Sequence, residues 1–157
     1  MNAAARQLLD TLGLAPLPGE GGFFRATWRS ETASAIYFLL TTEEFSALHR
    51  IGQDEIWHFY AGDPVAHVQL DSVTGDVRLA RLGPDIPGGE QPQVVVPAGV
   101  WQGAHLTAGP ERGSHGFALL GCTVSPPWDQ RGFSLADRDE LTRAFPLQAA
   151  LIRALTR

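Results

Sequence analysis

The chain has 157 residues and a formal net charge of −5, and its twelve basic residues are all arginines that occur singly. The absence of a basic run argues against binding to a nucleic-acid backbone. The absence of lysine excludes Schiff-base chemistry, a lysine general base and a phosphate-loop lysine.

Length and composition favour one domain spanning residues 1–157. At this size, with 44% hydrophobic residues, a chain can bury a single sizeable core. No stretch approaches the roughly twenty apolar residues of a membrane span, and the first residues lack a secretory pattern. We therefore expect a soluble, cytoplasmic protein with no membrane partner. Cys122, the one cysteine, lies in an apolar run and is expected to be a buried hydrophobe rather than a reactive thiol.

Helical patterns stand near both ends of the sequence. Leucines recur at helical spacing within residues 3–12, and Gly13 follows as a typical helix end. Farther along, Ser134 followed by Asp137 predicts a capped helix start, and leucines recur every four residues across 147–155. A short helix is therefore expected at each end.

The centre of the chain is typical of short strands. Alternating or continuous apolar runs predict them, in chain order, at residues 23–30, 33–41, 65–70, 77–82, 93–97, 100–106 and 116–124. The nearly continuous run at 33–41 predicts a strand covered on both faces. Eight or nine strands with regular turns indicate an all-β antiparallel sandwich or barrel.

Residues 46–62 hold the densest set of functional groups, and their pattern predicts a β-hairpin. Because side chains alternate along a strand, Glu55, Trp57 and Phe59 are expected on one face. His49 and Glu55 are then expected to face each other across one turn.

Two blocks of the sequence resemble the motifs of cupins. The first motif is His-x-His, three or four residues, Glu, six residues and Gly, and the second is Pro-x-Gly-x-x-His. The matching positions are His49, Ile51, Glu55 and Gly62, then Pro97, Gly99 and Gln102. The phrases GGFFRATWRS, AIYFLL, DEIWHFYAGDP and VVVPAGVWQGA are similar to the small cupin-5 subfamily. The resemblance implies a double-stranded β-helix (cupin jelly roll), usually a homodimer, with a pocket for a small molecule between its sheets.

The sequence departs from the metal-binding cupin pattern at two positions. A typical metal-binding cupin has imidazoles where this chain has Ile51 and Gln102. Ile51 cannot coordinate, and Gln102 offers a neutral carbonyl oxygen, which is a weak ligand for metals that favour imidazole. A set of His49, Glu55 and Gln102 could still hold a divalent ion with waters. The cofactor expectation is therefore none, or a weakly held divalent metal ion.

Without a metal, His49 and Glu55 become a candidate acid/base pair. Some cupins are sugar-nucleotide epimerases, so the resemblance implies an isomerase or epimerase acting on a carbohydrate or similar polar carbonyl compound. In that hypothesis Trp57 and Phe59 wall the pocket and Gln102 orients the substrate. Two alternatives stay open: a non-catalytic sensor or carrier, and a divalent-metal-dependent oxygenase or lyase.

Two further residues bear on ligand and partner. Arg25 is either a pocket cation that neutralises an anionic group of the ligand or one of a solvated row. His58 has the strand parity opposite to Glu55, which favours an outer face covered by a second subunit. A homodimer through an apolar outer sheet face is therefore expected.

Overall fold

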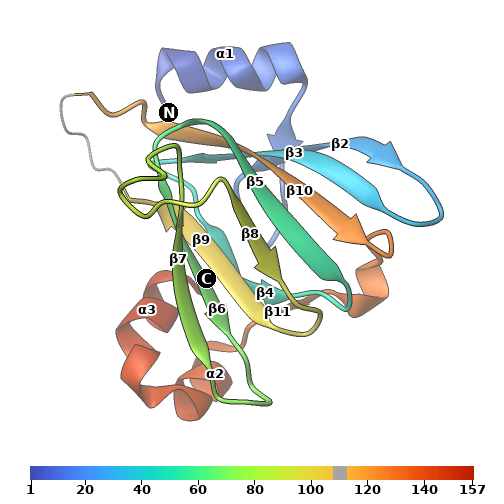
Figure 1. The fold of residues 1–157 in the computed structure, drawn as a ribbon, viewed down its shortest axis with the longest axis vertical. Helices are drawn as coiled ribbons and strands as arrows, with labels where there is room; N and C mark the ends of the chain where they lie inside the picture. The colour runs from blue at the N-terminus through green and yellow to red at the C-terminus, as the bar shows by residue number, and fades with distance from the viewer. Residues whose placement is uncertain (108–112) are drawn as a thin grey trace.

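The computed structural model describes residues 1–107 and 113–157, and within them two antiparallel sheets face each other (Figure 1). The six-stranded sheet has the order β1 (Ala15–Pro16), β2 (Phe23–Arg29), β3 (Ser34–Thr41), β10 (Phe117–Ser125), β5 (Asp54–Gly62), β8 (Gln93–Val96). The five-stranded sheet has the order β11 (Ser134–Leu135), β4 (Ser46–Arg50), β9 (Trp101–Leu106), β6 (Val65–Leu70), β7 (Val77–Leu82). The all-β expectation is confirmed.

Three short helices, α1 (Ala3–Leu12), α2 (Arg138–Ala144) and α3 (Ala149–Ala154), lie outside the two sheets (Figure 1). Gly13 closes α1 in the left-handed conformation, as expected for a helix end. At the start of α2, the Asp137 carboxylate accepts from the Glu140 backbone N–H at 2.8 Å. Ser134 lies in β11 instead of a helix. No helix in the described residues is long and apolar enough to cross a membrane.

The core lies between the sheets, with a smaller cluster beneath each helical region. Phe38 and Leu40 of β3 enter the main core, whereas Leu39 packs with the α1 residue Ala5 on the other side of the same strand. The prediction that this run is covered on both faces is thus confirmed for its second half. The helices α2 and α3 cover the five-stranded sheet, where Ile152 packs in one cluster with Leu48 and Val68.

The predicted hairpin at residues 46–62 is wrong. β4 pairs with β9 and β11, and β5 pairs with β10 and β8, so the two segments belong to opposite sheets. The short connection between them turns a corner of the sandwich. A hairpin and such a corner have the same local sequence pattern. They differ only in the strands that β4 and β5 pair with, and those strands lie far away in the sequence.

Two hydrogen bonds join this corner to the Pro-Ala-Gly turn that leads from β8 to β9. The Gly99 N–H donates to the Ile51 carbonyl at 2.8 Å. The Asp54 carboxylate accepts from the Ala98 N–H, also at 2.8 Å. The two turns that change sheets are therefore bound to each other, which holds the ends of β4 and β5 in place.

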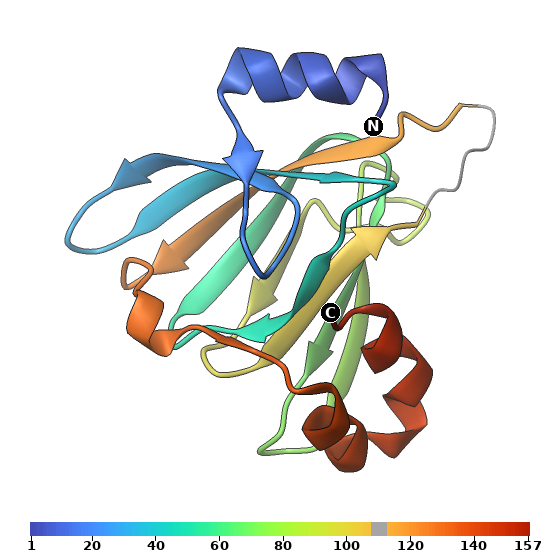
Figure 2. The same cartoon turned by 180° about the vertical axis from the view of Figure 1, so that it is seen from behind.

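A glycine-rich loop between β1 and β2 lies against β4, and it appears in blue in Figure 2. The Ala47 N–H donates to the Glu20 carbonyl at 2.8 Å, which attaches the loop to the strand. Gly22 has φ +72, and a Cβ atom at this position would stand 2.8 Å from a ring carbon of Phe38 and 3.0 Å from the Leu39 carbonyl oxygen. The close packing of this loop therefore requires glycine.

We expect Gly22→Ala to lower the free energy of unfolding by about 2–4 kcal/mol, because it adds a steric overlap to the cost of left-handed backbone. Urea denaturation measures the loss. Gly75→Ala is the matched control: its φ is +80 and nothing lies within 4 Å of the added atom. Equal losses in the two variants would contradict close packing at Gly22.

Candidate functional site

A cavity of about 540 Å³ opens between the two sheets. Its walls are mainly aromatic and aliphatic, and the aromatic side chains that line it are Phe24, Trp28, Phe38, Trp57, Trp128 and Phe133. Trp57 is 1% exposed and lies deep, whereas Trp28 is 54% exposed and marks the opening. Volumes of this order are typical of sites for small organic molecules.

His49 projects from β4 into this cavity with one ring nitrogen already bonded. Its Nδ1 lies 2.8 Å from the Ala47 carbonyl oxygen, and its ring stacks on Phe133 with 5.7 Å between centroids. A carbonyl only accepts, so Nδ1 carries the hydrogen of that bond. In the neutral ring Nε2 is then unprotonated, which makes it a base at the wall of the cavity.

Glu20 is a functional side chain that the sequence reasoning missed. Its residue is 9% exposed, its Oε1 accepts from the Ser46 hydroxyl at 2.8 Å, and its Oε2 lies 3.8 Å from His49 Nε2. The glycines around it were the available signal, because a carboxylate in a loop of positive-φ glycines can be carried close to a strand.

Glu55, at the start of β5, reaches the same cavity from the opposite sheet. Burial raises the pKa of its carboxyl group; the nearby His49 acts in the opposite direction, and Glu20 adds to the rise. Glu55 therefore retains its proton to a higher pH than an exposed glutamate does. The cavity thus holds a basic nitrogen and a group suited to act as an acid.

Gln102 connects Glu55 to Trp57 and is itself 0% exposed. Its Oε1 accepts from the Trp57 indole N–H at 2.8 Å, and its Nε2 donates to Glu55 Oε2 at 2.5 Å. The indole can only donate, so the amide orientation follows from chemistry. Oε2 of Glu55 is therefore an acceptor, and its acidic proton belongs on Oε1.

Of the six side chains expected at the site, His49, Glu55 and Trp57 line the cavity. Gln102 lies behind the wall, with both ends of its amide bonded within the protein. It is therefore placed to orient Glu55 and does not meet a ligand directly.

Arg25 and Phe59, expected to bind substrate, do not line the cavity. Phe24 and Ala26 of the same strand face inward, so alternation sends Arg25 outward, where its guanidinium lies 5.5 Å from the Tyr37 ring centroid. Phe59 packs against the core. Among the described residues, the arginine that lines the cavity is Arg29, which follows a register shift in β2.

The residues present do not fit the imidazole-rich metal centre of metal-binding cupins. Ile51 lines the cavity where an imidazole would stand, and the Gln102 carbonyl oxygen is occupied by Trp57. Across residues 1–107 and 113–157, no group of three or more His, Cys, Asp or Glu side chains is placed to hold a metal ion. The proposed ligand set of His49, Glu55 and Gln102 lacks its third member.

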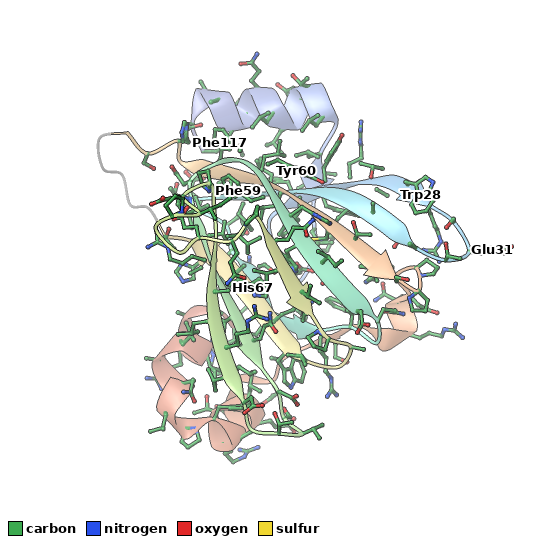
Figure 3. The ribbon with its side chains drawn as sticks, viewed as in Figure 1. Trp28, Glu31, Phe59, Tyr60, His67 and Phe117 are labelled. Atoms are coloured by element: carbon green, nitrogen blue, oxygen red, sulfur yellow. The ribbon has the colours of Figure 1, made fainter. Side chains whose placement is uncertain are left out.

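Two further buried side chains, His67 and Cys122, lie close to these residues. His67 on β6 (Figure 3) is 1% exposed, packs edge-on against Trp57 at 4.9 Å, and has no hydrogen-bond partner in the described residues for either ring nitrogen. Burial lowers its pKa to about 3. Cys122 lines the cavity, and burial raises the pKa of its thiol, so it remains protonated.

Comparisons with known proteins agree with this architecture. The model of the Cupin_5 family, described as "Cupin superfamily (DUF985)", matches residues 6–136. A hypothetical protein from Leishmania major is similar with 30% identity and a TM-score of 0.88, over 97% of this chain and 98% of that one. A protein from Shewanella oneidensis is similar with 35% identity and a TM-score of 0.87, over 100% and 98%.

A more distant likeness concerns the fold alone. A cupin 2 domain-containing protein from Halorhodospira halophila is 16% identical with a TM-score of 0.61, over 90% of this chain and 86% of that one. The comparison with curated proteins found no match. The double-stranded β-helix expected from the sequence is confirmed.

The raised pKa of Glu55 predicts a pH-dependent difference between the natural protein and Glu55→Gln. The folded state holds the proton more tightly than the unfolded chain, so the contribution of Glu55 to stability is complete below the ordinary pKa of 4.5 and is lost as pH rises through the folded value. We expect Glu55→Gln to gain stability relative to the natural protein as pH rises from 4.5 to 8.5. Urea denaturation across this range measures it, and a constant difference would contradict a raised pKa.

Proposed function

The chain belongs to the Cupin_5 family, and on that premise we propose that it is a small-molecule enzyme of isomerase or epimerase type. The proposed chemistry moves a proton at a carbon next to a carbonyl group. The observation that carries the proposal is the pairing, in one apolar cavity, of His49, whose Nδ1 is bonded to the Ala47 carbonyl, with a Glu55 carboxyl whose pKa is raised.

In the proposed reaction His49 Nε2 removes a proton from the substrate carbon, and the electron pair moves onto the carbonyl oxygen. Glu55 donates its proton to that oxygen, which gives a neutral enol. Return of the proton from His49 to the opposite face of that carbon, after the enol has turned in the cavity, gives the epimer, and Glu55 recovers its proton from the enol oxygen. In an α-hydroxy carbonyl compound, return of the proton to the neighbouring carbon gives the isomer, and Glu55 recovers its proton from the hydroxyl group of the first carbon. Each group ends with the proton count it began with, so the reaction needs no oxidant or reductant.

The environment supports acid and base roles in distinct ways. The Ala47 carbonyl holds His49 in one tautomer, and the stack on Phe133 restricts the ring. Gln102 donates to Glu55 Oε2, which orients the carboxyl group at the cavity wall. Groups held this way lose little freedom when they react, which is how positioned acids and bases gain rate.

The alternative of a non-catalytic sensor or carrier would use the same cavity without proton transfer. A structural role for the buried network would require only that its polar groups bond to one another. His49 Nε2 has no hydrogen-bond donor within the described residues and lines the cavity. That open nitrogen favours the catalytic proposal over the carrier.

We expect His49→Ala to reduce proton exchange by about 10²–10⁴-fold while leaving the fold intact, since the ring lies at a cavity wall. The measurement is deuterium incorporation from heavy water, followed by NMR, into a panel of small aldoses, keto acids and amino ketones. Proton exchange that survives in the variant would remove His49 from the reaction.

A matched control for this loss is His105→Ala. His105 lies on the same sheet, and its Nδ1 bonds to a backbone carbonyl at 2.8 Å, but it does not line the cavity. Exchange in this variant should equal that of the natural protein. Absence of exchange from every compound in the natural protein, after long incubation, would favour the carrier.

We also propose that two copies pair through the outer face of the six-stranded sheet. On that face Tyr60 is 51% exposed and meets Tyr37 edge-on at 6.3 Å, and Val95 is 49% exposed. The His58 ring stacks on Tyr60, as its strand parity led us to expect. Tyr60 is labelled in Figure 3.

Light scattering after gel filtration should give twice the chain mass of 17.0 kDa. Tyr60→Glu should shift the protein toward the monomer, because it places a charge in the proposed contact. Val73→Glu is the control, since Val73 is 95% exposed in a turn of the other sheet. A monomer at all concentrations would exclude the pairing.

A further inference from the structure

A carboxyl oxygen of Glu20 and a ring nitrogen of His49 face each other inside the cavity, farther apart than a hydrogen bond. Glu20 Oε2 and His49 Nε2 lie 3.8 Å apart, and the two residues are 9% and 3% exposed. The other polar atom of each side chain is occupied, by the Ser46 hydroxyl and the Ala47 carbonyl. Both side chains line the cavity, so a ligand with an N–H or O–H group can reach Glu20 Oε2 there.

The charge around these two atoms favours a cation. Of the two carboxyl side chains that line the cavity, Glu55 has a raised pKa, so the attraction for a cation comes from Glu20. Within residues 1–107 and 113–157 the one guanidinium that lines it belongs to Arg29, which is exposed and donates to the Trp128 carbonyl at 2.9 Å. A cationic ligand interacts favourably with the Glu20 carboxylate in a cavity whose other walls are largely apolar, whereas an anionic ligand is repelled by it.

The walls favour a ligand with an apolar body. Phe24, Phe38 and Trp57 present aromatic surface, and Ile36 and Val124 add aliphatic surface. A sugar nucleotide would bury many hydroxyl and phosphate groups here without partners, at a cost for each one. Aromatic faces also attract organic cations. The cavity therefore disfavours the carbohydrate substrates that family resemblance implied.

From these contacts we propose that the ligand is an organic ammonium compound with an aromatic or branched apolar body, whose nitrogen donates to Glu20 Oε2. The inference rests on the proposed function for one point only, the place of reaction. The carbon next to the ammonium group then faces His49 Nε2, because the two protein atoms are 3.8 Å apart. The substrate class is thus an amine that carries a carbonyl group.

The test is calorimetric binding of three probes that share a phenyl ring and a short alkyl chain: phenethylamine, phenethyl alcohol and 3-phenylpropanoate. We expect the amine to bind about tenfold or more tightly than the alcohol, because a hydrogen bond to a charged group is the stronger one. The carboxylate should bind most weakly. Equal affinity for the amine and the alcohol would overturn the proposal, as would failure of the amine to bind at millimolar concentration.

The variant Glu20→Gln removes the charge and keeps an oxygen that can accept from Ser46. It should lose the preference for the amine over the alcohol, with an unchanged unfolding temperature to show that the loop is intact. Glu31→Gln is the matched control, because it makes the same charge change at the exposed tip of the β2–β3 hairpin (Figure 3). A preference that survives in Glu20→Gln, or disappears in Glu31→Gln, would contradict the assignment to Glu20.

The binding experiment tests the ligand class and the exchange experiment tests the isomerase, so one proposal can fail while the other stands. Selective binding of the amine without proton exchange in any amino ketone would support the ligand class and count against the proposed isomerase. Proton exchange in neutral carbonyl compounds, without a preference for amines, would support the isomerase and overturn the ligand class.

Discussion

One side-chain amide joins the two sheets at the floor of the cavity, and the chemistry of the site depends on it. Gln102 belongs to the five-stranded sheet, whereas both of its partners, Trp57 and Glu55, belong to the six-stranded sheet. Because the indole can only donate, the amide has one orientation that satisfies all three groups. Loss of either bond would leave buried polar atoms without partners, which costs more than the bond itself contributes. The same bonds therefore hold the sheets in register and set which oxygen of Glu55 faces the ligand.

Around that floor, the other polar groups arrive from segments that the sandwich brings together. His49 comes from one sheet and Glu55 from the other, at a corner where the chain changes sheets. Glu20 comes from a loop whose glycines permit close packing against Phe38 and β4. Each group is held by a backbone or side-chain bond that leaves one atom directed at the cavity. The arrangement concentrates polarity in a few atoms and leaves the remaining wall apolar.

The fold and part of the site were predictable from sequence, for reasons that differ between residues. Strand periodicity and the two cupin-like blocks indicated the sandwich, and the first block pointed to His49 and Glu55, which both line the cavity. Parity left open whether Arg25 faces the pocket or the solvent, because the sequence does not say which face of β2 turns inward until Phe24 is seen in the cavity. Glu20 was missed because loops have no periodicity from which to infer direction. Gln102 was recognised from its motif, yet its role depends on Trp57, 45 residues away in sequence.

His67 is buried, neither of its ring nitrogens has a hydrogen-bond partner in the described residues, and it affects how the interior responds to pH. Its pKa of about 3 means that it stays neutral through mild acid, and the stability it contributes by being neutral is lost only as pH falls from 6.5 toward that value. Glu55 acts in the opposite direction, since its contribution is lost as pH rises through its raised pKa. Between these two limits both groups are uncharged, so neither adds a charge of its own to the interior. A charge that arrives with a ligand then interacts mainly with the groups that line the cavity.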